Sequence, residues 1–236
     1  MQESGMIAAY ADLLAGKLLF NPSLSRRVRQ EAQDHLCEAA AANPPGNGRE
    51  AIERAIANFG DPHAIAGQFA SVWLVRQTRK VGVAVILVII AVFAAMQTRI
   101  AWYTAAQWGL SDDIKAVATS VGFIDACAFW LSVIVGFAGC AYLVLRRAPS
   151  TILCARHTSR LRHLLLLSAV SAAALSVSVL SDGVLTALRL AGREFSASFL
   201  IPISALVIEI VSTGMLIFSI RTIFERMAHA TALIKM

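Results

Sequence analysis

The stretch EAQDHLCEAAAANPPGNGREAIERAIANFGDP, residues Glu31 to Pro62, contains two helical segments separated by a strong stop signal. The run NPPGNG at residues 43–48 ends the first segment, because proline and glycine are poor helix formers. Apolar residues then recur at helical spacing and predict a further helix, at Ile52, Ala55, Ile56 and Phe59. We therefore expect a small domain made of helices.

The most specific local signal in this stretch is the corner Phe59-Gly60-Asp61-Pro62. Gly60 suits the left-handed position that closes a helix. Asp61 suits the N-cap of the next helix, and Pro62 suits its first turn. These residues predict two helices that meet at a sharp corner.

Two more helices are predicted on the N-terminal side of this corner. A first amphipathic helix is indicated by helical spacing of Ile7, Tyr10, Leu13, Leu14 and Leu18. Pro22 disfavours helix at Asn21, and Ser23 or Ser25 is then expected to cap the second helix. One face of that second helix is predicted to carry Val28, Ala32, His35, Leu36 and Ala39.

His35 has two interpretations. A histidine near its ordinary pKa can act as a pH sensor or as a ligand. A side chain packed beside Leu36 requires fewer assumptions, and we favour it.

The helical stretch resembles the HAAS signalling domain, a small helical module also found as a prefix of bacterial membrane permeases. The resemblance covers roughly residues 5–75 and rests on Asp34, His35, Leu36, Glu50, Ala51, Ala55, Phe59, Gly60, Asp61 and Pro62. It implies a cytoplasmic domain joined to transmembrane helices, with a PadR-like transcriptional regulator as an expected partner. The alanine run at residues 39–42 departs from the family, where charges are more typical.

The composition is that of a membrane protein. Hydrophobic residues make up 57% of the chain, charged residues 15%, and the mean hydropathy is +0.65; soluble domains carry about 25% charged residues. Four apolar runs are long enough to cross a bilayer, at about 81–103, 117–145, 164–188 and 199–220. The predicted fold is all-α, with a cytoplasmic helical domain at 1–75 and a four-helix transmembrane domain at 76–236.

The distribution of basic residues predicts the orientation. Nine of the 21 Lys and Arg residues occur up to Lys80, five at 146–162 and three in the C-terminal tail. The other two connections are assigned four, namely Arg99, Lys115, Arg189 and Arg193. Positive charge is retained in the cytoplasm, so we expect both termini on the cytoplasmic side of the inner membrane. The basic residues flank apolar runs, which favours the lipid bilayer as their partner and not nucleic acid.

Three acidic residues, Asp125, Asp182 and Glu209, fall inside the predicted spans. An ionised and unpaired carboxylate there costs at least about 2.5–3.5 kcal/mol. One hypothesis is a shared polar site for a cation, a proton or a polar signal. The other, which we favour, is separate structural contacts between helices, with Arg189 near Asp182. The hydrogen-bonding neighbours expected for Glu209 are Ser204, Ser212 and Thr213.

The sequence contains no recognisable catalytic motif. The five histidines are scattered, and the four cysteines, which we expect to be reduced and packed, lack metal-ligand spacing: Cys37, Cys127, Cys140 and Cys154. We therefore predict no catalytic, cofactor or metal site. The leading hypothesis is a non-enzymatic regulatory membrane protein. The alternative is a transporter or channel component that uses the three carboxylates, and an intramembrane enzyme is a weaker third. Both the regulatory and the transport hypothesis are compatible with a homo-oligomer.

Overall fold

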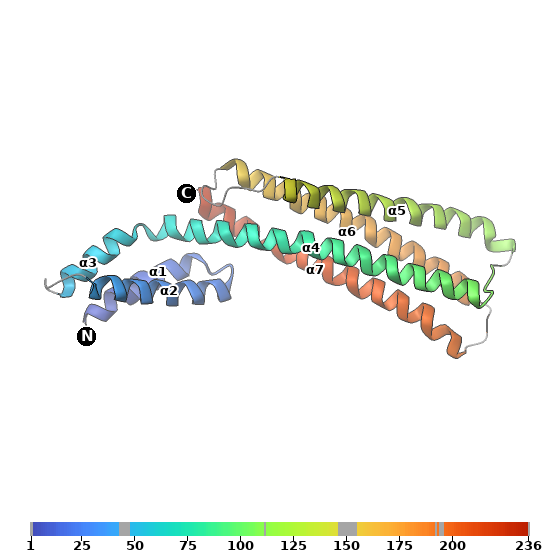
Figure 1. Cartoon of the computed structure of the whole chain (residues 1–236), viewed down its shortest axis with the longest axis horizontal. Helices are drawn as coiled ribbons and strands as arrows, with labels where there is room; N and C mark the ends of the chain where they lie inside the picture. Colours follow the sequence, from blue (N-terminus) through green and yellow to red (C-terminus); the bar gives the residue numbers. More distant parts are fainter. Residues whose placement is uncertain are drawn as a thin grey trace. The chain divides into compact units, whose positions relative to one another are not determined.

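The computed structural model describes residues 2–42, 48–110, 112–145, 155–191, 193 and 196–235, and all regular structure in them is helical (Figure 1). The predicted all-α class is confirmed for these residues. The elements are α1 (Gln2–Lys17), α2 (Pro22–Ala41), α3 (Gly48–Phe59), α4 (Pro62–Ala105), α5 (Asp112–Leu145), α6 (Ala155–Leu190), the short 3-10 helix η1 (Ala197–Phe199) and α7 (Leu200–Lys235).

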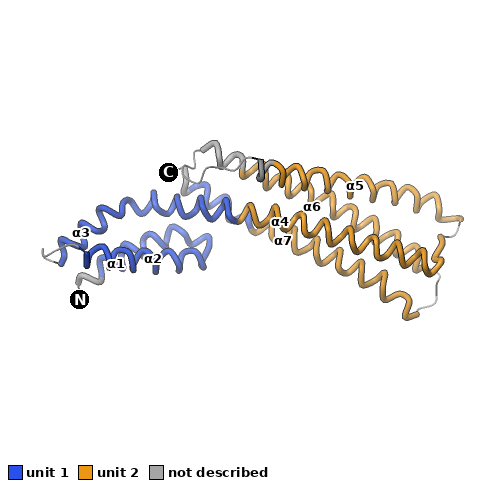
Figure 2. Tube along the Cα trace, in the orientation of Figure 1, with its two compact units in different colours: residues 1–76, 152–159, 223–236 blue, residues 77–151, 160–222 orange. Residues whose placement is uncertain are grey.

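The chain divides into two compact units (Figure 2). The first, called here the N-terminal unit, comprises residues 1–76, 152–159 and 223–236. The second, the bundle unit, comprises residues 77–151 and 160–222. Helix α4 contributes residues to both units, so the chain passes from one to the other without leaving helical structure.

A small hydrophobic core joins α1, α2 and α3 in the N-terminal unit. Its buried members are Ile7, Leu36, Ile52 and Ala55, and Tyr10 and Phe59 pack against them. The rings of Tyr10 and Phe59 meet edge to face with centroids 5.8 Å apart. The apolar spacing read from the sequence therefore does form the core of this unit.

His35 is exposed, so the packed environment that we favoured for it is wrong. Val28, Ala32 and Leu36 are buried at intervals of four residues and define the inner face of α2. At about 100° per residue, His35 lies at the edge of that face, one step from Leu36 and two turns after Val28. Its exposure is therefore decided by how α2 packs against its neighbours and not by helical spacing alone. Ala39 is likewise exposed.

Helix α2 is capped by Asn21 and not by Ser23 or Ser25. The Asn21 side-chain oxygen accepts hydrogen bonds from the Leu24 amide at 3.3 Å and from the Ser23 hydroxyl at 2.8 Å. The helix begins earlier than expected, with Pro22 as its first residue. Proline suits this position because the backbone N–H that it lacks would have no partner inside the helix there. The Ser25 hydroxyl instead donates to the Ala15 carbonyl at 2.8 Å, which ties α2 to α1.

The corner between α3 and α4 has the predicted conformation. Gly60 has a φ of +103°, and the Asp61 carboxylate accepts a 3.1 Å hydrogen bond from the Ala64 amide. Helix α4 begins at Pro62. A contact that the sequence did not predict holds the corner to α1, since the Tyr10 hydroxyl donates to the Gly60 carbonyl at 2.7 Å.

Four helices are long and apolar enough to span a membrane, over Pro62–Ala105, Asp112–Ala141, Leu161–Leu190 and Ala197–Ala232. Each of these helices overlaps one of the four predicted spans, and by length and composition the four together suggest a multi-pass membrane protein. Large apolar side chains such as Phe123, Leu180 and Phe218, each 71% exposed, cover the outside of the bundle unit. Such a surface suits a hydrocarbon solvent.

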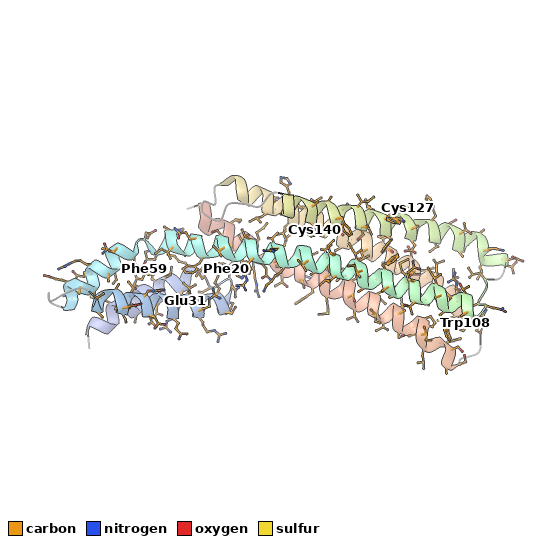
Figure 3. All side chains as sticks on the ribbon, in the orientation of Figure 1. Phe20, Glu31, Phe59, Trp108, Cys127 and Cys140 are labelled. Atoms are coloured by element: carbon orange, nitrogen blue, oxygen red, sulfur yellow. The ribbon has the colours of Figure 1, made fainter. Side chains whose placement is uncertain are left out.

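The described cysteines are free, as predicted, but only Cys140 is partly buried. Cys37 and Cys127 are exposed, which corrects the packed environment expected for them. Cys127 and Cys140 both lie on α5 (Figure 3). Cys154 lies outside the described residues.

Candidate functional site

A buried arginine lies in the bundle unit, six residues before the end of α4. Arg99 on α4 is 1% exposed, and its guanidinium donates to carboxylates on two other helices, Asp182 on α6 and Glu209 on α7. The Arg99 Nη2 to Glu209 Oε1 distance is 2.8 Å. A second guanidinium nitrogen donates to the Thr186 hydroxyl oxygen at 3.2 Å. We call Arg99, Asp182, Thr186 and Glu209 the Arg99 cluster.

Helical spacing explains how α6 and α4 supply this cluster. Asp182 and Thr186 are four residues apart and therefore lie on one face of α6. Arg99 and Tyr103 are related in the same way on α4. The Tyr103 hydroxyl donates to Thr186 Oγ1 at 3.2 Å, so this one oxygen accepts hydrogen bonds from two residues of α4.

The third predicted carboxylate, Asp125 on α5, lies beside the cluster and has a different partner. The Ser178 hydroxyl donates to it at 2.5 Å, and Ser178 precedes Asp182 by one turn of α6. Asp125 is buried, and it is close enough to interact electrostatically with Arg99 and with Glu209. The structure therefore brings Asp182 and Glu209 together on one guanidinium and places Asp125 next to them.

The neighbours predicted for these carboxylates differ from those observed. Asp182 pairs with Arg99 and not with Arg189, whose guanidinium lies over the Tyr103 ring. Glu209 does not bond to Thr213, because the Thr213 hydroxyl is buried without a partner. Ser204 is exposed and donates to the Ile201 carbonyl. In both cases an arginine on another helix has taken the place of the neighbours expected on the same helix.

Arg99 is the residue that the sequence reasoning misplaced. It was counted with the basic residues of a connection, whereas the structure buries it within α4. A charged residue inside an apolar span is itself a signal of function or of pairing. The presence of three carboxylates in other spans was the clue that an arginine partner was needed.

The charges in and around the cluster do not balance. One guanidinium faces the carboxyl groups of Asp182 and Glu209, with Asp125 close by. Only one oxygen of Glu209 is bonded, and Oε2 is buried without a hydrogen-bond partner. Leaving a buried polar atom unpaired costs about 1–3 kcal/mol. The cluster therefore has more hydrogen-bond acceptors than donors to satisfy them.

No cluster of three or more metal-ligating side chains occurs among the described residues. The residues of the N-terminal unit that carry the resemblance to the HAAS domain do not form a buried site. Leu36 is in the core, His35 is exposed, and Phe59 to Pro62 form the capped corner. His35 is thus part of an exposed surface, and Phe59 to Pro62 form a turn of defined conformation.

Comparison with known proteins yields no match: no family model, no curated protein and no solved structure is similar to this chain.

Proposed function

We propose that this protein is a non-enzymatic regulatory protein of the inner membrane. Its N-terminal unit binds a cytoplasmic protein, and its bundle unit senses a change at the Arg99 cluster. The main support for this proposal is the continuity of helix α4, which runs unbroken from the Gly60–Pro62 corner to beyond Arg99. A single secondary-structure element thus contains both the motif corner and the buried charge.

The motif residues support a protein partner. The outer face of α2 is exposed and carries acidic residues and histidine, notably Asp34, His35 and Glu38. The resemblance to the HAAS domain suggests a PadR-like transcriptional regulator as the occupant of this surface. A regulator bound there would be held at the membrane, and its availability to DNA would depend on the state of the bundle.

The orientation follows from the charge distribution. Arg99 is buried in the bundle, which leaves three basic residues, Lys115, Arg189 and Arg193, for the side opposite the N-terminus. The remaining 17 belong to the N-terminal part, the 146–162 segment and the C-terminal tail. The positive-inside rule supports cytoplasmic termini.

The test is co-purification of the full-length protein, in detergent, with a PadR-like regulator that is co-expressed with it. We expect a stable complex that is lost when Asp34 and Glu38 are both changed to Lys. Arg49 and Arg54 on α3 are exposed and provide a matched control, because R49E/R54E reverses two charges outside the α2 surface. Absence of a complex with the correctly folded wild-type protein would contradict the proposal.

A second candidate is a transporter or channel component. The excess of carboxylates over basic groups at the Arg99 cluster favours it, since ion and proton pathways contain such groups. Its test is proton or cation flux into liposomes, compared between the wild type and Glu209→Gln. Wild-type liposomes that show no flux above protein-free liposomes would remove this candidate.

A further inference from the structure

A depression of about 400 Å³ opens at the end of the bundle unit where α4 turns toward α5. The depression is wide open, and both polar and apolar groups line it. Figure 3 shows Trp108 at this end. We call the depression the aromatic pocket, and its walls are Ile100, Tyr103, Thr104, Gln107, Trp108, Gly109 and Arg189.

The backbone at the end of α4 builds one wall of the aromatic pocket. The Trp108 amide donates to the Tyr103 carbonyl at 2.9 Å and the Gln107 amide to the Thr104 carbonyl at 3.2 Å. These two bonds define a Schellman motif. The motif turns Trp108 back over Tyr103, and their rings stack with centroids 6.0 Å apart.

The motif places Gln107 in the left-handed region, with a φ of 54°, where glycine is the usual residue. A side chain with a Cβ costs about 1–2 kcal/mol there. Such strain is concentrated at functional sites. Gln107 thus places an amide side chain in the pocket wall at some expense to stability.

Two guanidinium groups lie on the stacked rings. Arg189 lies 4.2 Å from the centroid of Tyr103, and Arg193 lies 5.0 Å from that of Trp108. Arg189 Nε is buried and has no hydrogen-bond partner, and no carboxylate of the described residues forms a salt bridge with Arg189. Among the residues that the structure describes, the positive charge of Arg189 is therefore without a carboxylate partner, and its Nε donor is without an acceptor.

We propose that the aromatic pocket binds an anionic group, a phosphate or a carboxylate, that is attached to an apolar or aromatic body. Arg189 contacts the anion, because the N–H donors of a guanidinium can bind two oxygens of a carboxylate or of a phosphate at the same time. The stacked rings of Tyr103 and Trp108 contact the apolar body. The source is either a lipid headgroup or a water-soluble organic anion.

A hydrogen bond links one wall residue of the aromatic pocket, Tyr103, to the Arg99 cluster. The Tyr103 ring lies under Arg189, and its hydroxyl donates to Thr186 Oγ1, which accepts from Arg99 as well. A ligand that moves Tyr103 would therefore alter a hydrogen bond of the buried cluster. This inference goes beyond the proposed function and does not require the N-terminal unit to bind a regulator.

The test is calorimetric titration of the full-length protein in phosphatidylcholine nanodiscs with phenyl phosphate. We expect saturable binding that weakens at least about tenfold in Arg189→Gln, because a charge-assisted contact is worth more than 1.4 kcal/mol. Lys115→Gln is the matched control: it removes one positive charge near this end of the bundle but lies outside the pocket. Its affinity is expected to stay within about twofold of the wild type.

A second arm identifies a lipid source. If phenyl phosphate does not bind, replacing part of the phosphatidylcholine by phosphatidylglycerol should raise the melting temperature of the wild type and of K115Q but not of R189Q. Gln107→Gly is the substitute pocket variant if R189Q does not fold. It should stay folded, because glycine relieves the backbone strain at this position. It should weaken binding of phenyl phosphate, because it removes the side chain of Gln107 from the pocket wall. Equal responses of the wild type and the folded pocket variant in both arms would overturn the proposal.

Discussion

Arg99 on α4 donates a 2.8 Å hydrogen bond to Glu209 on α7, and the two side chains are only 1% and 0% exposed. The same guanidinium holds Asp182 on α6. Three spans of the bundle unit are therefore joined through one charged group. Because neither partner reaches water, each depends on the other for its charge to be tolerated.

Arg99→Leu should destabilise the bundle by about 3–5 kcal/mol, because it leaves two carboxyl groups without their counter-charge. The measurement is the free energy of unfolding in detergent micelles. Lys115→Leu removes an exposed charge and should change that free energy by less than about 0.5 kcal/mol. Adding D182N and E209Q to R99L should recover much of the loss. A single R99L variant as stable as the wild type would show that the ion pairs contribute nothing.

Ser178→Ala should destabilise the bundle by about 1–3 kcal/mol, since Asp125 would lose its hydrogen-bond donor inside the bundle. Ser176→Ala is a matched control two residues earlier, because the Ser176 hydroxyl only donates to the Ala172 carbonyl of its own helix. A double-mutant cycle of S178A with D125A, which removes the acceptor, should give a coupling energy of at least about 0.5 kcal/mol. Additive effects would exclude the contact.

Gly136→Ala should destabilise the bundle by about 1–3 kcal/mol through overpacking. A Cβ at Gly136 would lie 2.9 Å from Ile89 Cδ1 and 3.1 Å from Ser171 Oγ. Gly122→Ala, on the same helix, meets nothing within 4 Å and should be neutral or stabilising. Unfolding midpoints of the two variants in one detergent make the comparison, and a G136A variant as stable as G122A would contradict the close packing.

Gly60→Ala should destabilise the N-terminal unit by about 1–2 kcal/mol, because alanine is strained at a φ of +103°. Gly16→Ala, inside α1 with open space around it, should stabilise by about 0.5–1 kcal/mol. Amide hydrogen exchange of α3 in the full-length protein measures both. Equal protection in the two variants would mean that the corner is not rigid.

The N-terminal unit should lose stability at high pH through Tyr10. Burial, and then the carboxylate of Asp61, raise the pKa of Tyr10 above its ordinary 10.0. The native state then holds the proton more tightly than the unfolded state, so this contribution is complete below pH 10 and is lost as the pH rises through the raised pKa. Tyr10→Phe should abolish this loss of stability, measured by hydrogen exchange of α1 to α3 from pH 9 upward. The same loss of stability in Y10F would mean that other groups cause it.

The corner and the spans could be read from the sequence because their causes are local. Gly60, Asp61 and Pro62 each act within one turn of helix, and the conformation found at each is the one expected. A span is decided by the hydropathy of consecutive residues, and all four were found where expected. The α2 cap was misassigned because Asn21 and Ser23 are both good caps, and only the position of Pro22 in the first turn selects between them.

The contacts of the charged side chains were decided by the tertiary structure. Arg99 lies 83 residues from Asp182 and 110 from Glu209 in sequence. Which face each helix turns to its neighbours is set by packing of all four spans, so no local pattern pairs these residues. The same holds for His35, whose exposure depends on how α2 is rotated against α1 and α3. The amino-acid sequence by itself therefore determined which stretches are helical and how the corner between α3 and α4 is built, through local hydrogen bonding and hydropathy. Only the packing of helices against one another decided that one guanidinium joins three of the spans.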